Sequence, residues 1–192
     1  EIPQATKKMI AGKKLLSAPA DSSEALTKAS ESKRPVIFLS AVANVRMRIA
    51  GTIKHSIANG TGVRFVVFVQ GCAHHCAGCH NPDTWDFNGG EEISPKDMAE
   101  MIRNTPYIDG LTLSGGDPFF QEEACLELLE HLPKKLDVWV YTGFEYDEVK
   151  DRPLGKVADV LVTGKYVEEL RCLGKMFGSS NQEIHRRGID DA

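Results

Sequence analysis

Residues 64–82 read RFVVFVQGCAHHCAGCHNP, an apolar run that leads into a loop with three cysteines. The run Arg64–Val69 is rich in β-branched and aromatic residues, and its nearly continuous apolar character is typical of a strand buried on both faces. Gly71 ends this strand, so Cys72, Cys76 and Cys79 follow at its carboxyl end. Because α/β folds bind ligands at that edge of the sheet, we expect the three thiols to line a ligand site.

The sequence beyond the cysteine loop alternates between helical and strand patterns. Ser94 can cap a helix that begins at Pro95, where proline suits the first helical position. We also expect helices over 121–132 and 144–150, and strands over 110–113, 136–142 and 157–162. This alternation indicates right-handed βαβ units and a mainly parallel sheet. A full eight-unit barrel needs about 250 residues, so we predict an α/β fold with a partial, open βα barrel.

Charge is distributed unevenly along the chain. The 192 residues carry a net charge of −4, but the first 46 carry +4 and the rest carry −8. We expect residues 1–46 to form a flexible extension and residues 47–192 to form the functional domain. The mild acidity argues against nucleic acid as a partner. No apolar run approaches about 18 residues, which argues against a membrane span, and the apolar run at 35–45 is too short and too far from the N-terminus for an export signal.

Three of the five cysteines lie within eight residues. An odd count and a tight cluster favour a metal or cluster site in a reducing compartment such as the cytoplasm over a disulfide framework. Iron–sulfur clusters are usually held by four cysteines, and a centre held by three leaves an open position for a substrate. A zinc site with His74, His75 or His80 as the fourth ligand is the alternative, although structural zinc usually joins two separated pairs of ligands.

The cysteine spacing and several further motifs resemble known enzymes. Cys-x₃-Cys-x₂-Cys is the signature of the radical S-adenosylmethionine superfamily. NGTGVR at 59–64, FVQGC at 68–72, CHNPDTW at 79–85 and LSGGDP at 113–118 are similar to the glycyl-radical activating enzymes. VWVYTG at 138–143, DVLV at 159–162 and FGSSNQ at 177–182 narrow the resemblance to the activating proteins of anaerobic ribonucleoside-triphosphate reductase. The resemblance runs from Met47 to His185 and departs from the family pattern at Gly60-Thr61-Gly62 and Thr163-Gly164-Lys165.

The resemblance implies a radical chemistry. Cys72, Cys76 and Cys79 would hold one 4Fe-4S cluster, and an electron donor such as flavodoxin would reduce it. Reductive cleavage of S-adenosylmethionine would give methionine and a 5′-deoxyadenosyl radical. That radical would remove a hydrogen atom from a glycine of the large subunit of anaerobic ribonucleoside-triphosphate reductase, so the resemblance implies an oxidoreductase that generates a glycyl radical.

The resemblance also implies contacts to S-adenosylmethionine. Ser114-Gly115-Gly116-Asp117 resembles the loop that binds the methionine part, and two glycines allow bare backbone to approach a ligand closely. Thr142 at the end of the next strand and Lys165 after the following strand would line the same site. A structural interpretation is also open, in which the glycine loop is an ordinary strand-to-helix turn and Lys165 is a solvated side chain.

Two cysteines lie outside the cluster. Cys125 falls on the apolar stripe of its helix and is expected to be a small buried hydrophobe, whereas Cys172 lies in a polar segment.

Two alternative functions are also open. One is a radical S-adenosylmethionine enzyme that acts on another glycyl-radical partner or on a small molecule. The other is a zinc-binding interaction module without catalysis.

Overall fold

The computed structural model describes residues 45–188. The expected extension over 1–46 therefore lies almost entirely outside the described residues. The first strand, β1, begins at Met47. Among the described helices, none combines the length and the apolar character needed to cross a bilayer.

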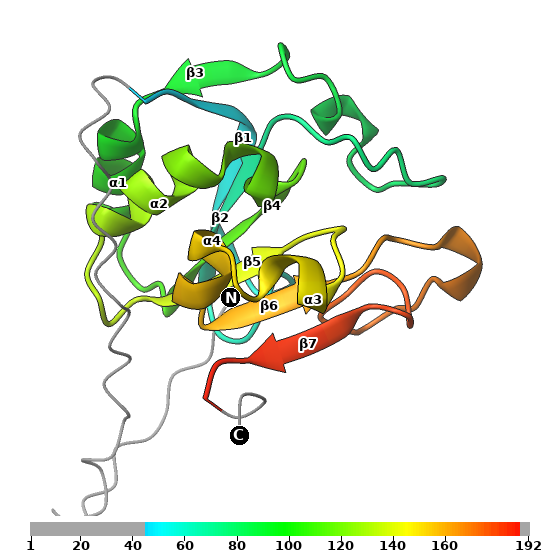
Figure 1. Ribbon diagram of the computed structural model, residues 1–192. Coiled ribbons are helices and arrows are strands. Elements are labelled where there is room, and N and C mark those ends of the chain that lie inside the picture. Colours follow the sequence, from blue (N-terminus) through cyan, green and yellow to red (C-terminus); the bar gives the residue numbers. More distant parts are fainter. Residues whose placement is uncertain (1–44, 189–192) are drawn as a thin grey trace, which may run out of the picture. The chain divides into compact units, whose positions relative to one another are not determined.

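Within residues 45–188, seven strands form one open sheet in the order β3-β1-β2-β4-β5-β6-β7 (Figure 1). The strands are β1 Met47–Ser56, β2 Arg64–Val69, β3 Glu91–Ile93, β4 Gly110–Gly115, β5 Asp137–Tyr141, β6 Val160–Thr163 and β7 Glu183–Arg186. Strands β2, β4, β5 and β6 run parallel to one another. β1 pairs antiparallel with both β2 and β3, and β7 pairs antiparallel with β6.

The α/β class is confirmed, but the expectation of a mainly parallel sheet is wrong, because antiparallel strands flank the parallel centre on both sides. Connection length gives one reason. Residues 57–63 join β1 to β2, and a connection this short suits an antiparallel pair, since a parallel crossover needs a dozen or more residues. The sequence patterns identified the four parallel strands and missed the antiparallel strands β1, β3 and β7 that flank them.

The described part of the chain contains four short α-helices: α1 Pro95–Arg103, α2 Glu122–Glu130, α3 Tyr146–Val149 and α4 Pro153–Val157. The expected start of α1 is confirmed, because Ser94 Oγ accepts a hydrogen bond from Asp97 N at 3.0 Å and Pro95 is the first helical residue. The helix expected over 121–132 is preceded by a 3₁₀ turn, η2 Pro118–Gln121. Helix α4 was not expected; it ends at Val157, the first residue of the strand predicted over 157–162, and β6 begins at Val160.

The helices cover one face of the sheet. Alternate side chains of the parallel strands pack with buried residues of all four helices in one core; the strand members are Phe65, Val67, Val69, Leu111, Leu113, Val138, Val140 and Leu161. Figure 1 shows α2, α4 and α3 along the same side of the central strands. The opposite face carries a smaller cluster around Trp139, with Tyr141 and Phe177 packed against it. This second face of the sheet is therefore partly covered by the loop that contains Met176 and Phe177.

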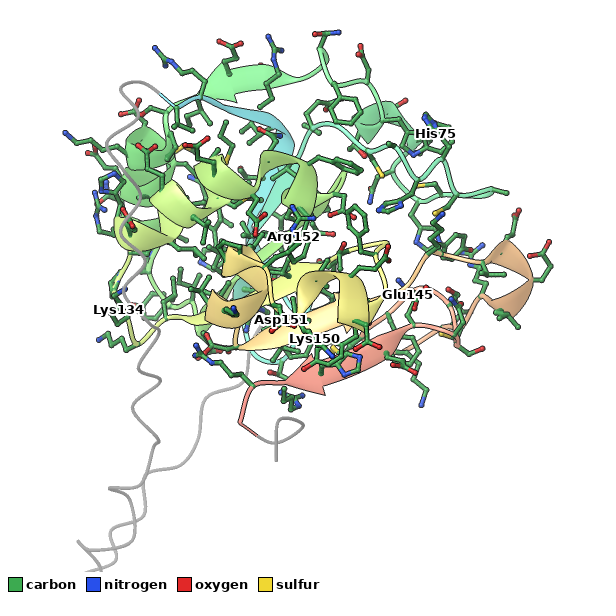
Figure 2. All side chains as sticks on the ribbon, in the orientation of Figure 1. His75, Lys134, Glu145, Lys150, Asp151 and Arg152 are labelled. Atoms are coloured by element: carbon green, nitrogen blue, oxygen red, sulfur yellow. The ribbon has the colours of Figure 1, made fainter. Side chains whose placement is uncertain are left out.

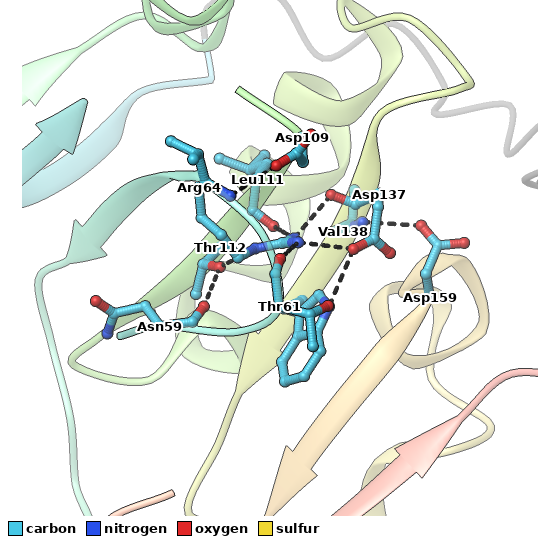
Figure 3. A network of polar contacts seen from close by, with 11 residues as sticks. Asn59, Thr61, Arg64, Asp109, Leu111, Thr112, Asp137, Val138 and Asp159 are labelled. Atoms are coloured by element: carbon cyan, nitrogen blue, oxygen red, sulfur yellow. Dashed lines mark hydrogen bonds and ion pairs between the residues drawn. The ribbon is translucent and has the colours of Figure 1, made fainter. Parts of the chain in front are cut away.

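A buried arginine network secures the amino ends of the parallel strands (Figure 3). Arg64 is fully buried, and its guanidinium pairs with Asp137 Oδ2 at 2.7 Å. The same group donates to Thr112 Oγ1 at 2.8 Å and to the backbone oxygen of Leu111 at 2.6 Å. A buried charge is tolerated when it is paired and its donors are satisfied. Arg64 therefore ties β2, β4 and β5 together at the edge opposite the cysteine loop.

Candidate functional site

Backbone hydrogen bonds join the two ends of the cysteine loop. Gly71 N donates to Thr84 O at 2.8 Å and Cys72 N donates to Trp85 O at 3.2 Å, so the loop returns to the point where it leaves β2. Gly71 has φ of +93°, and an added Cβ would lie 2.6 Å from the Phe87 ring. Glycine is required here, since a side chain would meet both a strained backbone and an aromatic ring.

The three loop cysteines line one cavity of about 490 Å³. The ends of β4 and β5, Gly164 after β6, and residues 172–178 line the same cavity. Figure 2 shows His75, within the cysteine loop, far from Lys134, which precedes β5. The cavity therefore lies at the carboxyl ends of the parallel strands, and its volume falls within the roughly 300–1,000 Å³ of small-ligand sites.

The protein environment disfavours ionisation of Cys72. Burial raises the pKa of its thiol; a backbone hydrogen bond from His74 lowers it, and the negative charges of Asp117, Cys76 and Cys79 raise it. Because metals bind the thiolate, a cationic centre in the cavity would offset the cost of ionising these thiols. Within residues 45–188, no three His, Cys, Asp or Glu side chains are close enough to hold a single metal ion. Three thiols around one cavity suit the chemistry of an iron–sulfur cluster.

Two glycines bring the end of β4 against the cysteine loop. Gly115 has φ of +100°, and an added Cβ would lie 2.7 Å from Phe68 Cα. A Cβ on Gly116 would lie 2.5 Å from Gly71 O. Across this contact Gly116 N donates to Val69 O at 2.7 Å. The glycine pair is therefore needed for the close contact between the end of β4 and the cysteine loop, independently of any ligand. Ser114, Gly115 and Gly116 also line the cavity.

Asp117 is the centre of a buried hydrogen-bond network. Its Oδ2 accepts from His74 Nε2 at 2.8 Å, Thr142 Oγ1 at 2.8 Å and Gly143 N at 2.9 Å. Its Oδ1 accepts from Phe119 N at 3.0 Å, and the residue is 1% exposed. Asp117 and Thr142 both line the cavity, but the carboxylate already has four donors from the protein.

Lys165 is placed differently from the other expected site residues. It is exposed and does not line the cavity, whereas its neighbours Gly164 and Tyr166 do. Asn181 Nδ2 donates to Lys165 O at 2.8 Å, and Gln182 Nε2 donates to Gly164 O at 2.9 Å. The Gly-Ser-Ser-Asn-Gln motif therefore fixes the backbone after β6, and the structure does not bring the Lys165 side chain to the cysteines.

The two remaining cysteines differ in their surroundings. Cys125 is fully buried in the helix-side core, as expected, and burial raises the pKa of its thiol. Cys172 is half-buried and lines the same cavity as the loop cysteines. Sequence reasoning also did not assign Tyr141 and Asn59 to the cavity. The signal for Tyr141 was present, since it directly precedes Thr142 at a strand end.

Comparison with known proteins agrees with this arrangement. The family described as a 4Fe-4S single cluster domain matches residues 58–185. Anaerobic ribonucleoside-triphosphate reductase-activating proteins are similar over most of their own length. The one from Enterobacteria phage T4 is 36% identical over 134 residues, 66% of this chain and 85% of the relative. The one from Escherichia coli K12 is 38% identical over 143 residues, 67% of this chain and 92% of the relative.

The matched span contains the cysteine loop, the glycine pair after β4 and the motif that fixes the backbone after β6. The match therefore covers the elements that build the cavity as well as the cysteine spacing. Matches of this extent to a cluster domain and to relatives of one kind establish the family. The chain belongs to the anaerobic ribonucleoside-triphosphate reductase-activating proteins, within the 4Fe-4S single cluster domain family.

Proposed function

We propose that this chain is a radical S-adenosylmethionine enzyme that generates the glycyl radical of anaerobic ribonucleoside-triphosphate reductase. The observation that carries the proposal is the shared cavity, which three cysteines of one loop and the glycine pair after β4 both line. The family's relatives are named for activation of that reductase. Bound by Cys72, Cys76 and Cys79, a 4Fe-4S cluster would supply the electron that cleaves S-adenosylmethionine to a 5′-deoxyadenosyl radical.

The protein's own part is to bind and orient the cofactor beside the three thiols. Backbone groups of Ser114, Gly115 and Gly116 line the cavity and can take the amino-acid part of S-adenosylmethionine, because glycines leave the backbone accessible. Thr142 is 5% exposed and its hydroxyl donates to Asp117, so we assign it to shaping the wall. Lys165 would have to swing inward to meet a carboxylate.

The open sheet suits a protein substrate. In this proposal the sheet is a partial barrel of the radical S-adenosylmethionine type, whose missing strands leave the cavity accessible to a glycine-bearing segment of the reductase. Exposed apolar side chains near the cysteine loop, Phe87 at 47% and Phe120 at 37%, offer contact surface for such a segment. An electron donor such as flavodoxin and a location in the cytoplasm complete the proposal.

Anaerobic reconstitution with iron and sulfide tests the cluster assignment. We expect about four irons per chain and cleavage of S-adenosylmethionine after reduction with dithionite. Cys76→Ser and Cys79→Ser should lose both properties, whereas the matched control Cys125→Ala, in the helix-side core, should keep them. Zinc in place of iron, or a loaded and reduced protein without cleavage, would refute the proposal.

A further inference from the structure

We infer that His74 is a positioning residue that locks the cysteine loop onto the cofactor-facing ends of β4 and β5 through the carboxylate of Asp117. The inference rests on the proposed function. It assigns His74 a task, and it assigns Asp117 to the protein framework in place of direct contact with the cofactor. The atoms that carry it belong to three segments that are distant in sequence and meet at one oxygen.

The first observation is the convergence at Asp117 Oδ2. His74 lies between the first two loop cysteines, and its Nε2 reaches Oδ2 at 2.8 Å. Thr142 Oγ1 and Gly143 N reach the same oxygen from the end of β5 at 2.8 and 2.9 Å. Asp117 itself follows β4. One buried carboxylate therefore fixes the loop, β4 and β5 relative to one another, and hydrogen bonds to a charged acceptor are among the stronger ones.

The second observation is the fit of the His74 ring. Its side chain is 9% exposed and stands edge-on to Phe144 with ring centroids 4.7 Å apart. Phe120 packs against it at 5.7 Å. A Cβ on Gly143 would lie 2.6 Å from His74 Cδ2, so the bare backbone of a glycine makes room for the ring. The imidazole is therefore enclosed by Phe120, Phe144 and the backbone of Gly143.

The consequence concerns the geometry between cluster and cofactor. The loop presents the cysteines, while the ends of β4 and β5 present the backbone that would hold S-adenosylmethionine. Reacting atoms must approach to about 3–3.5 Å, and a displacement of about 1 Å can cost a hundredfold in rate. The hydrogen bond from His74 to Asp117 joins the cysteine loop to the ends of β4 and β5. Its loss should therefore affect the binding and cleavage of S-adenosylmethionine more than assembly of the cluster.

The test uses the reconstituted full chain. His74→Phe keeps an aromatic ring and removes the bond to Asp117, and His74→Gln restores an N–H donor at a similar reach. Equilibrium dialysis of S-adenosylmethionine against the unreduced holoprotein measures affinity without turnover, and iron per chain measures cluster assembly. Thr142→Val removes a second bond at the same carboxylate, together with the bond from Phe144 N to the Thr142 hydroxyl. Its matched control, Thr105→Val, removes an equally buried hydroxyl bond to Met101 O in α1.

We expect His74→Phe and Thr142→Val to weaken S-adenosylmethionine binding about tenfold or more with near-normal iron. His74→Gln should recover most of the affinity, and Thr105→Val should match the unaltered chain. The inference is overturned if His74→Phe binds like the unaltered chain, or if His74→Gln is as impaired as His74→Phe. Failure of the unaltered chain to take up iron or bind S-adenosylmethionine would refute the proposed function instead, so the two failures are distinguishable.

Discussion

Gly116→Ala tests the contact between the end of β4 and the cysteine loop. A methyl group at this position would lie 2.5 Å from Gly71 O and 3.0 Å from Val69 O, both of which are backbone atoms. Backbone cannot rotate away as a flexible side chain can, so the two segments must separate. Separation would strain or break the bonds from Gly116 N to Val69 O and from Asp117 N to Gly71 O, at 2.7 and 2.9 Å.

The magnitude follows from these contacts. Overpacking of a closely packed site costs about 1–3 kcal/mol, and each lost hydrogen bond adds about 0.5–1.5 kcal/mol. The free energy of unfolding should therefore fall by about 2–6 kcal/mol, which lowers the melting temperature of a domain of this size by on the order of 10 °C. Gly51→Ala is the control for backbone strain without a clash, because Gly51 has φ of +159° and an added Cβ there meets nothing within 4 Å.

Thermal unfolding of the metal-free chain followed by circular dichroism measures the change in stability, and iron per chain after reconstitution measures the effect on the loop. We expect Gly116→Ala to melt well below Gly51→Ala and to bind less iron. If Gly116→Ala melts with the unaltered chain and loads fully, the close approach of β4 to the cysteine loop is not what requires the glycine.

Three further variants probe the framework. Arg64→Met should cost about 3 kcal/mol in urea unfolding, since it leaves the buried acceptors Thr112 Oγ1 and Leu111 O without the guanidinium donor; an unchanged midpoint would contradict this. Burial raises the Tyr141 pKa to about 12. The stabilising effect of its neutral hydroxyl is therefore complete below about pH 10 and lost as the pH rises through 12. Tyr141→Phe should flatten the melting temperature over that window, and an equal decline in both proteins would refute the assignment. Ser94→Ala should cost about 1 kcal/mol of unfolding free energy through loss of the α1 cap, and no measurable loss would show that the cap contributes nothing.

The sequence predicted those features that depend on local patterns. The apolar run Arg64–Val69 is a central strand, and the cap at Ser94 starts a helix where expected. The antiparallel strands that flank the parallel centre were missed because their local patterns are weak. β1 is partly exposed and paired with irregular register, and β7 has four residues with none fully buried. Their pairing partners decide their structure, and these are distant in sequence.

The same distinction between local patterns and contacts distant in sequence applies to the residues of the site. Local spacing brought the three cysteines and the glycine pair to attention, and the structure places them around one cavity. The role of Asp117 could not be inferred, because its partners His74 and Thr142 lie 43 and 25 residues away. Lys165 was assigned from its position after a strand, which does not determine the direction of an exposed side chain.

The most direct test of the central claim is electron paramagnetic resonance of the reductase after anaerobic incubation with the reconstituted chain, S-adenosylmethionine and dithionite. We expect a glycyl radical signal on the reductase, with none when Cys76→Ser replaces the unaltered chain. A chain that is fully loaded with iron and cleaves S-adenosylmethionine, yet leaves the reductase without a radical, would contradict it.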